Sequence, residues 1–156
     1  MSNFVFNIAK GKAGQYFQNV KDGSPANSRI IVVPIEATGV EADDALKDHN
    51  TLDELLTAAN NEQATMGRKT VAAADLTLTV DDTTNLLKVE MADQTWAAAT
   101  GNAISDLLLC YDPDNTAGDD TTIIPLTCHD FSVTPDGSDV VGDVGANGVY
   151  QATEPA

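Results

Sequence analysis

The chain has 156 residues, and its 24 Asp and Glu against 8 Lys and Arg give a formal net charge of −16 at pH 7. This length suits one domain with a single core. The negative charge disfavours nucleic acid as a partner, because affinity for phosphate comes mainly from Lys and Arg. The sequence has no apolar run long enough to span a bilayer and no basic-then-apolar leader, so we expect neither a membrane partner nor an export signal.

The first 29 residues differ from the rest in charge. They carry four basic residues and one acid, whereas residues 89–156 carry twelve acids and no Lys or Arg. Residues 4–8 are typical of a short extended segment, and apolar residues recur at helical spacing over residues 9–20. Gly11 and Gly14 weaken that helix by about 1 kcal/mol each. We therefore expect a neighbour, such as another subunit, to hold the helix in place.

The residues that follow are predicted to be mostly β. Residues 29–37 form a buried strand, in which Pro34 indicates an edge or a bulge. A short helix begins after Thr51, because Thr51 and Glu54 have the spacing of a capping box. The later predicted strands are residues 76–80 and 86–91, which form a hairpin, and residues 94–98, 103–111, 121–134 and 147–153.

Many short strands joined by linkers rich in Asp, Gly, Asn and Thr predict a single β-sandwich or jelly-roll-like barrel. We expect this mostly β fold to carry one or two short helices and an extended N-terminal arm. Residues 1–29 are interpreted as a docking arm that is part of the same unit, and residues 30–156 as the β-sandwich domain.

The stretch CYDPDNTAGDDTTIIPLTCHDF, residues 110–131, is the strongest candidate for a metal site because it holds five Asp, two Cys and one His. An EF-hand loop needs glycine at its sixth position and glutamate at its twelfth. Counted from Asp112, the seventh position is Gly118 and the twelfth is Ile123, so this motif fails. We interpret the stretch as a hairpin connection, and leave open whether the loop Asp112–Asp120 binds a cation opportunistically.

The cysteines and histidines give no metal-site pattern. Cys110 and Cys128 are predicted to be free core residues, since a hairpin through 112–122 would place Cys110 opposite a residue near Thr122. Cys128 and His129 are adjacent, so on a strand they point to opposite faces and do not share a ligand. His49 lies in an acidic turn and is predicted to be a surface residue. We expect no metal and no cofactor.

Motifs for catalysis are equally absent from the sequence. It has no G-x-S-x-G elbow and no phosphate-binding loop. Carboxylates are abundant, but nothing predicts an apolar pocket that would raise the pKa of one of them, so we expect no enzymatic activity. Trp96 is interpreted as a residue that anchors the core, in preference to a residue of an interface. Arg68 and Lys69 either contact a neighbour or form an intramolecular salt bridge, and both readings stay open.

Five segments carry a family resemblance: FVFNIAKGK, EATGVEADDALKDHNTLDELL, TMGRKT, TWAAATGNAISDLLLCYDPD and IPLTCHDFSVTPDGSD. Together they resemble a family of short structural proteins encoded among the head genes of tailed bacteriophages. The resemblance runs through roughly residues 4–140, and no single motif in it names a biochemical activity. The pattern W-x-A-A-T-G-N…LLLCYD also resembles β-sandwich modules of phage tail appendages.

The resemblance implies a viral structural protein, a cement or decoration protein on the outside of the virion head that is made in the host cytoplasm. Its partners would be the major capsid protein and copies of itself, as a dimer or trimer. A tail or receptor-binding appendage is the first alternative, and a calcium- or glycan-binding β module is the second. The candidate interface residues are Phe4, Phe6, Lys10, Lys12, Tyr16, Phe17, Arg68 and Lys69.

Overall fold

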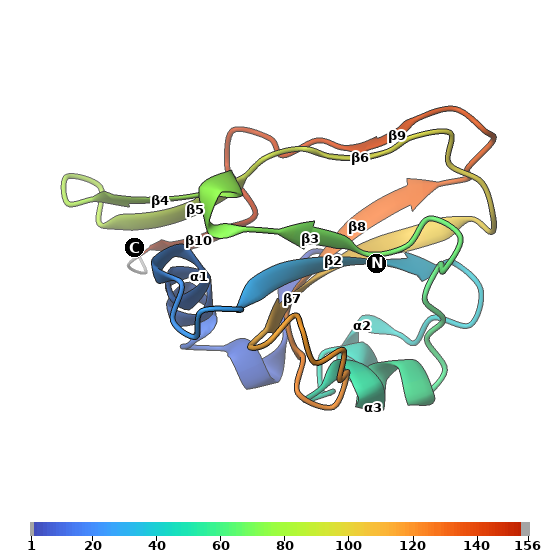
Figure 1. The fold of residues 1–156 in the computed structure, drawn as a ribbon, viewed down its shortest axis with the longest axis horizontal. Coiled ribbons are helices and arrows are strands. Elements are labelled where there is room, and N and C mark those ends of the chain that lie inside the picture. Colours follow the sequence, from blue (N-terminus) through green and yellow to red (C-terminus); the bar gives the residue numbers. More distant parts are fainter. Residues whose placement is uncertain (1, 154–156) are drawn as a thin grey trace.

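A five-stranded antiparallel sheet forms the centre of the computed structural model, which describes residues 2–153 (Figure 1). Its strands, in spatial order, are β1 (Phe4–Val5), β8 (Ile124–Val133), β7 (Ile104–Asp112), β2 (Arg29–Glu36) and β3 (Lys69–Val71). The hairpin connection predicted between residues 111 and 121 joins β7 to β8, as expected.

Two smaller sheets and short helices complete the fold around the central sheet. The small sheets are β10 (Tyr150–Thr153), β5 (Leu86–Met91) and β4 (Leu76–Asp81), and the pair β6 (Gln94–Trp96) and β9 (Val140–Gly142). The helices are α1 (Ala13–Asp22), α2 (Asp43–Leu46) and α3 (Leu52–Thr57), with 3-10 turns η1 (Asn7–Ala9) and η2 (Ala73–Asp75). Figure 1 shows α2 and α3 on one side of the central sheet and β6 and β9 on the other. The prediction of a mostly β, sandwich-like fold with short helices is confirmed.

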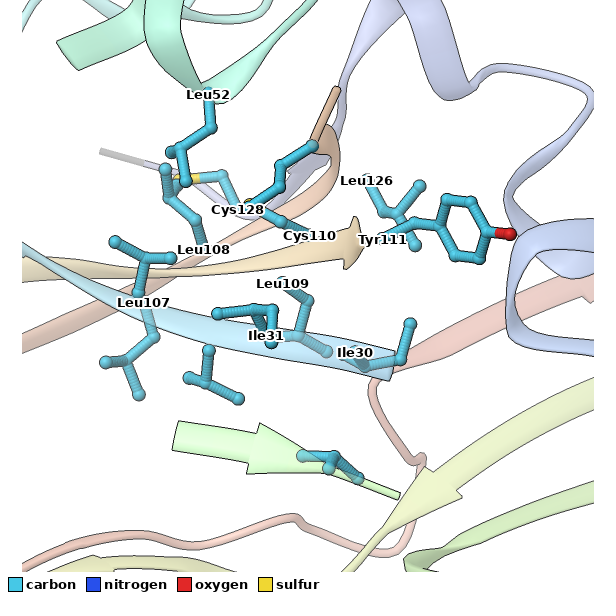
Figure 2. Close-up of a cluster of buried hydrophobic side chains, with 14 of the residues drawn as sticks. Ile30, Ile31, Leu52, Leu107, Leu108, Leu109, Cys110, Tyr111, Leu126 and Cys128 are labelled. Carbon is cyan, nitrogen blue, oxygen red and sulfur yellow. The ribbon is translucent and has the colours of Figure 1, made fainter. Parts of the chain in front are cut away.

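Strand β7 lies at the middle of the core, and all nine of its residues are buried. The side chains of alternate residues point to opposite faces of the sheet. In Figure 2, Leu108 and Cys128 lie toward Leu52 of α3, whereas Leu107 points the other way. Both faces of this strand are covered, so its residues 107–111, LLLCY, form a continuous apolar run instead of a polar–apolar alternation.

Of two local predictions, the capping box at Thr51 is confirmed, whereas the edge predicted at Pro34 exists only locally, because β2 lies between β7 and β3. Thr51 caps α3, because its side chain accepts a hydrogen bond from Glu54 N at 3.2 Å. Pro34 lies in β2 beyond the end of β3, which pairs with β2 only as far as Val32. The Pro34 carbonyl accepts from Gln63 N at 2.9 Å, so the position where proline lacks an N–H faces a loop and no ladder bond is lost.

The N-terminal segment is the main correction to the sequence-based prediction. Residues 4–22 do not form an extended arm, because they are packed into the domain. Phe4 pairs with Cys128 at the edge of the central sheet, and Phe6 and Phe17 have 0% exposure. Burying two aromatic side chains stabilises this arrangement by several kcal/mol, about 1.5–3 for each large apolar side chain. The segment is therefore continuous with residues 30–153, without a boundary at position 29.

The neighbour that α1 needs is the chain itself. The helix packs on the sheet of β4, β5 and β10, where a Cβ built on Gly14 would lie 2.9 Å from Leu87 Cδ2. Glycine therefore allows the helix to approach the sheet closely. Phe17 extends the same contact by stacking on Tyr150, with 5.9 Å between ring centroids. This tertiary packing offsets the low helix propensity of glycine.

Candidate interaction surfaces

The aromatic candidates for the partner interface lie inside the molecule. Phe6 and Phe17 are fully buried, so neither is free to contact another protein, and this part of the sequence-based assignment is wrong. Phe4 is half-buried and meets Phe6 edge-on, with ring centroids 5.2 Å apart. Tyr16 is half-buried against Tyr111, at 4.8 Å between centroids. Helical spacing correctly identified Tyr16 and Phe17 as part of an apolar face, and that face turns toward the core.

The basic candidates near the N-terminus are at the surface. Lys10 and Lys12 are exposed on the turn between η1 and α1. Lys10 Nζ donates to Asn7 Oδ1 at 2.6 Å. No ion pair joins either lysine to a carboxylate within residues 2–153. This basic turn, residues 10–12, therefore presents two positive charges to solvent.

Arg68 is held within the chain by two carboxylates. Its Nε and Nη2 donate to Glu62 at 2.9 and 2.7 Å, and its Nη1 and Nη2 donate to Asp120 at 2.6 and 2.8 Å. Both pairs are bidentate, the geometry in which a guanidinium binds carboxylates most specifically. Of the two readings left open by the sequence, the structure shows the intramolecular one. Arg68 thereby ties the start of β3 to the loop between β7 and β8.

Lys69 lies beside the only tryptophan. Its Nζ is 5.6 Å from the centroid of the Trp96 ring, within the range of a cation–π contact. Trp96 is 2% exposed, and its Nε1 donates to Gly67 O at 2.9 Å. The prediction that Trp96 anchors the core is confirmed, and Lys69 covers the outer side of that anchor.

The acidic loop between β7 and β8 is organised by local hydrogen bonds. Asp114 Oδ1 accepts from Thr116 N at 3.2 Å, and Asp119 Oδ1 accepts from Thr121 N at 2.9 Å. The neighbouring hydroxyl groups donate to the same oxygens, and these bonds lower the pKa of both carboxyls. Asp120 is bound to Arg68. Within residues 2–153, no group of three His, Cys, Asp or Glu side chains is placed to hold a metal ion.

Both cysteines are free and buried, as predicted. Cys128 pairs with Leu108 and Cys110 pairs with Pro125, beyond the predicted partner near Thr122, because the connection between β7 and β8 is longer than in a simple hairpin and β8 begins only at Ile124. Burial raises the pKa of both thiols, with loss of hydration as the main cause. Neither thiol is therefore poised as a nucleophile.

The two histidines occupy different environments. His49 was predicted at the surface but is 18% exposed, and its Nε2 lies 2.7 Å from Glu41 Oε2. His129 Nε2 lies 2.9 Å from Thr127 Oγ1, on the face of β8 opposite Cys128. Partial burial lowers the pKa of His129, which favours its neutral form.

His129 lines a cleft of about 250 Å³ between the central sheet and the segment 142–149. Its apolar walls include Leu107, Leu109 and Phe131. A shallower groove of about 270 Å³ continues from it past β1 and β10. Polar side chains share the lining with these apolar walls, among them Asn3, Gln94, Asp130 and Asp143. Sequence reasoning missed the cleft, because the segment 142–149 reaches the sheet only through long-range packing.

Sequence reasoning also missed Asp106, a carboxyl with 0% exposure in the middle of β7. Ser105 Oγ donates to it at 2.6 Å and Cys128 Sγ donates at 3.4 Å. Burial raises the pKa of Asp106, and the nearby charge of Asp130 acts in the same direction. The signal in the sequence was an acidic residue directly before the apolar run LLLCY.

In comparisons with known proteins, no family model, no curated protein and no solved structure matches the chain. None of the helices within residues 2–153 combines the length and apolar character of a membrane span.

Proposed function

We propose that the chain is a virion structural protein, a cement or decoration protein that binds the outer surface of a tailed-phage head through protein–protein contacts. The observation that carries the proposal is the basic turn, where Lys10 and Lys12 are exposed in a molecule of net charge −16. Two solvated cations on an acidic protein provide a directed contact for carboxylates of a capsid shell, because complementary charge orients association. The resemblance to phage head proteins is the reason for proposing a tailed-phage head as that shell.

The contacts of the polar side chains within the chain support a structural role. Arg68 is bound to two carboxylates, both thiols are buried, and the aspartates of the β7–β8 loop accept hydrogen bonds from their own turns. These groups stabilise the fold and hold its loops in place. What the molecule offers a partner is therefore shape and surface charge.

The proposal is tested by cosedimentation of the purified chain with empty heads that lack tails. The variant Lys10→Gln/Lys12→Gln is expected to weaken binding about tenfold, the effect of losing charged contacts at an interface. The matched control is Thr100→Glu/Thr134→Glu, which makes the same change in net charge at exposed sites elsewhere. Equal binding by both variants, or equal loss in both, would contradict docking through the basic turn.

Copy number separates the head from the tail. A cement protein is expected in many copies on tailless heads, whereas a tail or receptor-binding appendage is expected in few copies and only on tailed particles. A rise in melting temperature on addition of calcium or glycans would instead favour the binding module, because a ligand that binds the native state stabilises it.

A further inference from the structure

Strand β4 has a free edge at one end of the molecule. It is the outer strand of the sheet β10–β5–β4, and no strand among residues 2–153 pairs with its other side. The β4–β5 hairpin projects from the body at the left end of the view in Figure 1. Val80, in this strand, is the most exposed large hydrophobic residue of the described chain, at 72%. An apolar strand edge of this kind pairs readily with another strand.

The hydrogen bonds identify which backbone groups face outward. Asp75 O accepts from Ala92 N at 3.1 Å, so alternate positions from Asp75 onward, including Thr77 and Thr79, direct their N–H and C=O toward β5. The residues between them, Leu78 and Val80, direct theirs to the free edge.

The outward direction is verified at the start of the strand. There Leu76 O accepts from Lys21 Nζ at 2.7 Å. The Lys21 ammonium group therefore binds the first outward-facing carbonyl of the edge. The backbone N–H and C=O groups of Leu78 and Val80 remain available for another strand.

We propose that this edge pairs with the same edge of a second copy, antiparallel and about a two-fold axis at Thr79. Leu78 of each copy then lies opposite Val80 of the other copy. The backbone N–H and C=O groups of Leu78 form hydrogen bonds with those of Val80, and the two-fold axis makes this pair occur twice. Their side chains share one face, so Val80 becomes covered. The pairing joins two three-stranded sheets into one of six strands.

Charge selects both the partner and the register. With the axis at Thr79, Asp82 lies opposite Leu76 of the other copy, where the Lys21 ammonium is bound. Asp82 is exposed, and each dimer contains this cation–anion contact twice. An axis at Leu78 would set Asp81 opposite Asp75, and like charges directly opposite each other are unfavourable. The register about Thr79 thus places a cation opposite an anion, whereas the register about Leu78 places two anions opposite each other.

The inference does not rest on the proposed function, and hydrogen exchange of the free protein tests it. At high protein concentration the amides of Leu78 and Val80 are expected to exchange about tenfold more slowly than at low concentration. The amides of Thr77 and Thr79 face β5, so their exchange is expected to depend far less on concentration. Exchange of Leu78 and Val80 that is independent of concentration, in a protein that sediments as a monomer, would overturn the proposal.

Variants test the same edge by sedimentation. Val80→Pro removes an outward N–H and is expected to abolish the dimer, whereas Val80→Thr retains the N–H and is expected to weaken the dimer less. Asp82→Lys is expected to weaken it by facing Lys21, and the control Asp143→Lys, with the same change in charge, is not. Circular dichroism establishes that each variant is folded. Protection of Leu78 and Val80 only when empty heads are added would show that the edge pairs with a different protein, and would also overturn the proposal.

Discussion

Replacing Arg68 by lysine tests whether this residue serves the fold or a partner. The guanidinium forms four hydrogen bonds with Glu62 and Asp120, and its side chain is 28% exposed. Hydrogen bonds between charged groups contribute about 1.5–3 kcal/mol when shielded, and exposed ion pairs contribute about 0–1 kcal/mol. Lysine can retain one of the two carboxylates, so we expect Arg68→Lys to lower the free energy of unfolding by about 1–2 kcal/mol.

The removal of the charge is expected to cost more. Arg68→Met leaves both carboxylates without their cation, and we expect a loss of about 2–3 kcal/mol. Urea unfolding followed by Trp96 fluorescence measures both changes, because Trp96 is buried beside the neighbouring residue Lys69. The midpoint is expected to fall with little change in slope.

The control is Lys88→Met, which removes a cation from the single pair with Glu90, 3.0 Å apart. We expect this pair to contribute less than about 1 kcal/mol. If Arg68→Lys unfolds at the same urea concentration as the wild type and yet loses binding to empty heads, the reasoning is refuted. In that case Arg68 would act at a partner interface.

Three further predictions concern Asp106, Gly101 and the two cysteines. Asp106→Asn is expected to be more stable than the wild type, by a margin that grows as the pH rises from acid to neutral. The pKa of Asp106 is raised in the folded state, so the wild type loses stability as this carboxyl ionises. Urea midpoints at a series of pH values measure the difference. Gly101→Ala is expected to cost about 2 kcal/mol or more, because φ is +114° there and the new Cβ would lie 2.2 Å from Gln63 Nε2; thermal unfolding measures it. Cys110 and Cys128 are expected to react with a thiol reagent more than about a hundredfold faster in urea than in the native state, and equal rates would show that the sheet opens locally.

The strands were predictable because their signals are local. The alternation over residues 76–80 and the turn that follows predict a hairpin, and the structure pairs β4 with β5 in a continuous register. Asn85 adopts a left-handed conformation there, with φ of 50°, which asparagine tolerates better than most residues. Likewise, the capping box at Thr51 depends on residues only three positions apart. Each of these features is encoded within a few neighbouring residues.

The contacts that escaped prediction join residues far apart in the chain. Arg68 and Asp120 are separated by 52 positions, and nothing in either local sequence indicates the pairing. The amphipathic pattern of α1 predicted a buried face without identifying what covers it. Gly14 was read as a weakness of an isolated helix, although the approach to Leu87 is what requires it. Composition and periodicity describe what each segment needs and leave its partner undefined.

The burial of the N-terminal segment changes how docking on a shell would work. An arm that orders on binding pays its conformational entropy at that moment, but Phe6 and Phe17 are already fixed in the core. Releasing them into water would cost about 1.5–3 kcal/mol for each aromatic side chain, a large part of the 5–15 kcal/mol by which a typical domain is stable. If the chain docks on a shell as proposed, the shell would meet a preformed surface, on which Lys10 and Lys12 are exposed. Charge substitutions at these two positions separate docking from folding, whereas truncation of the segment would remove both together.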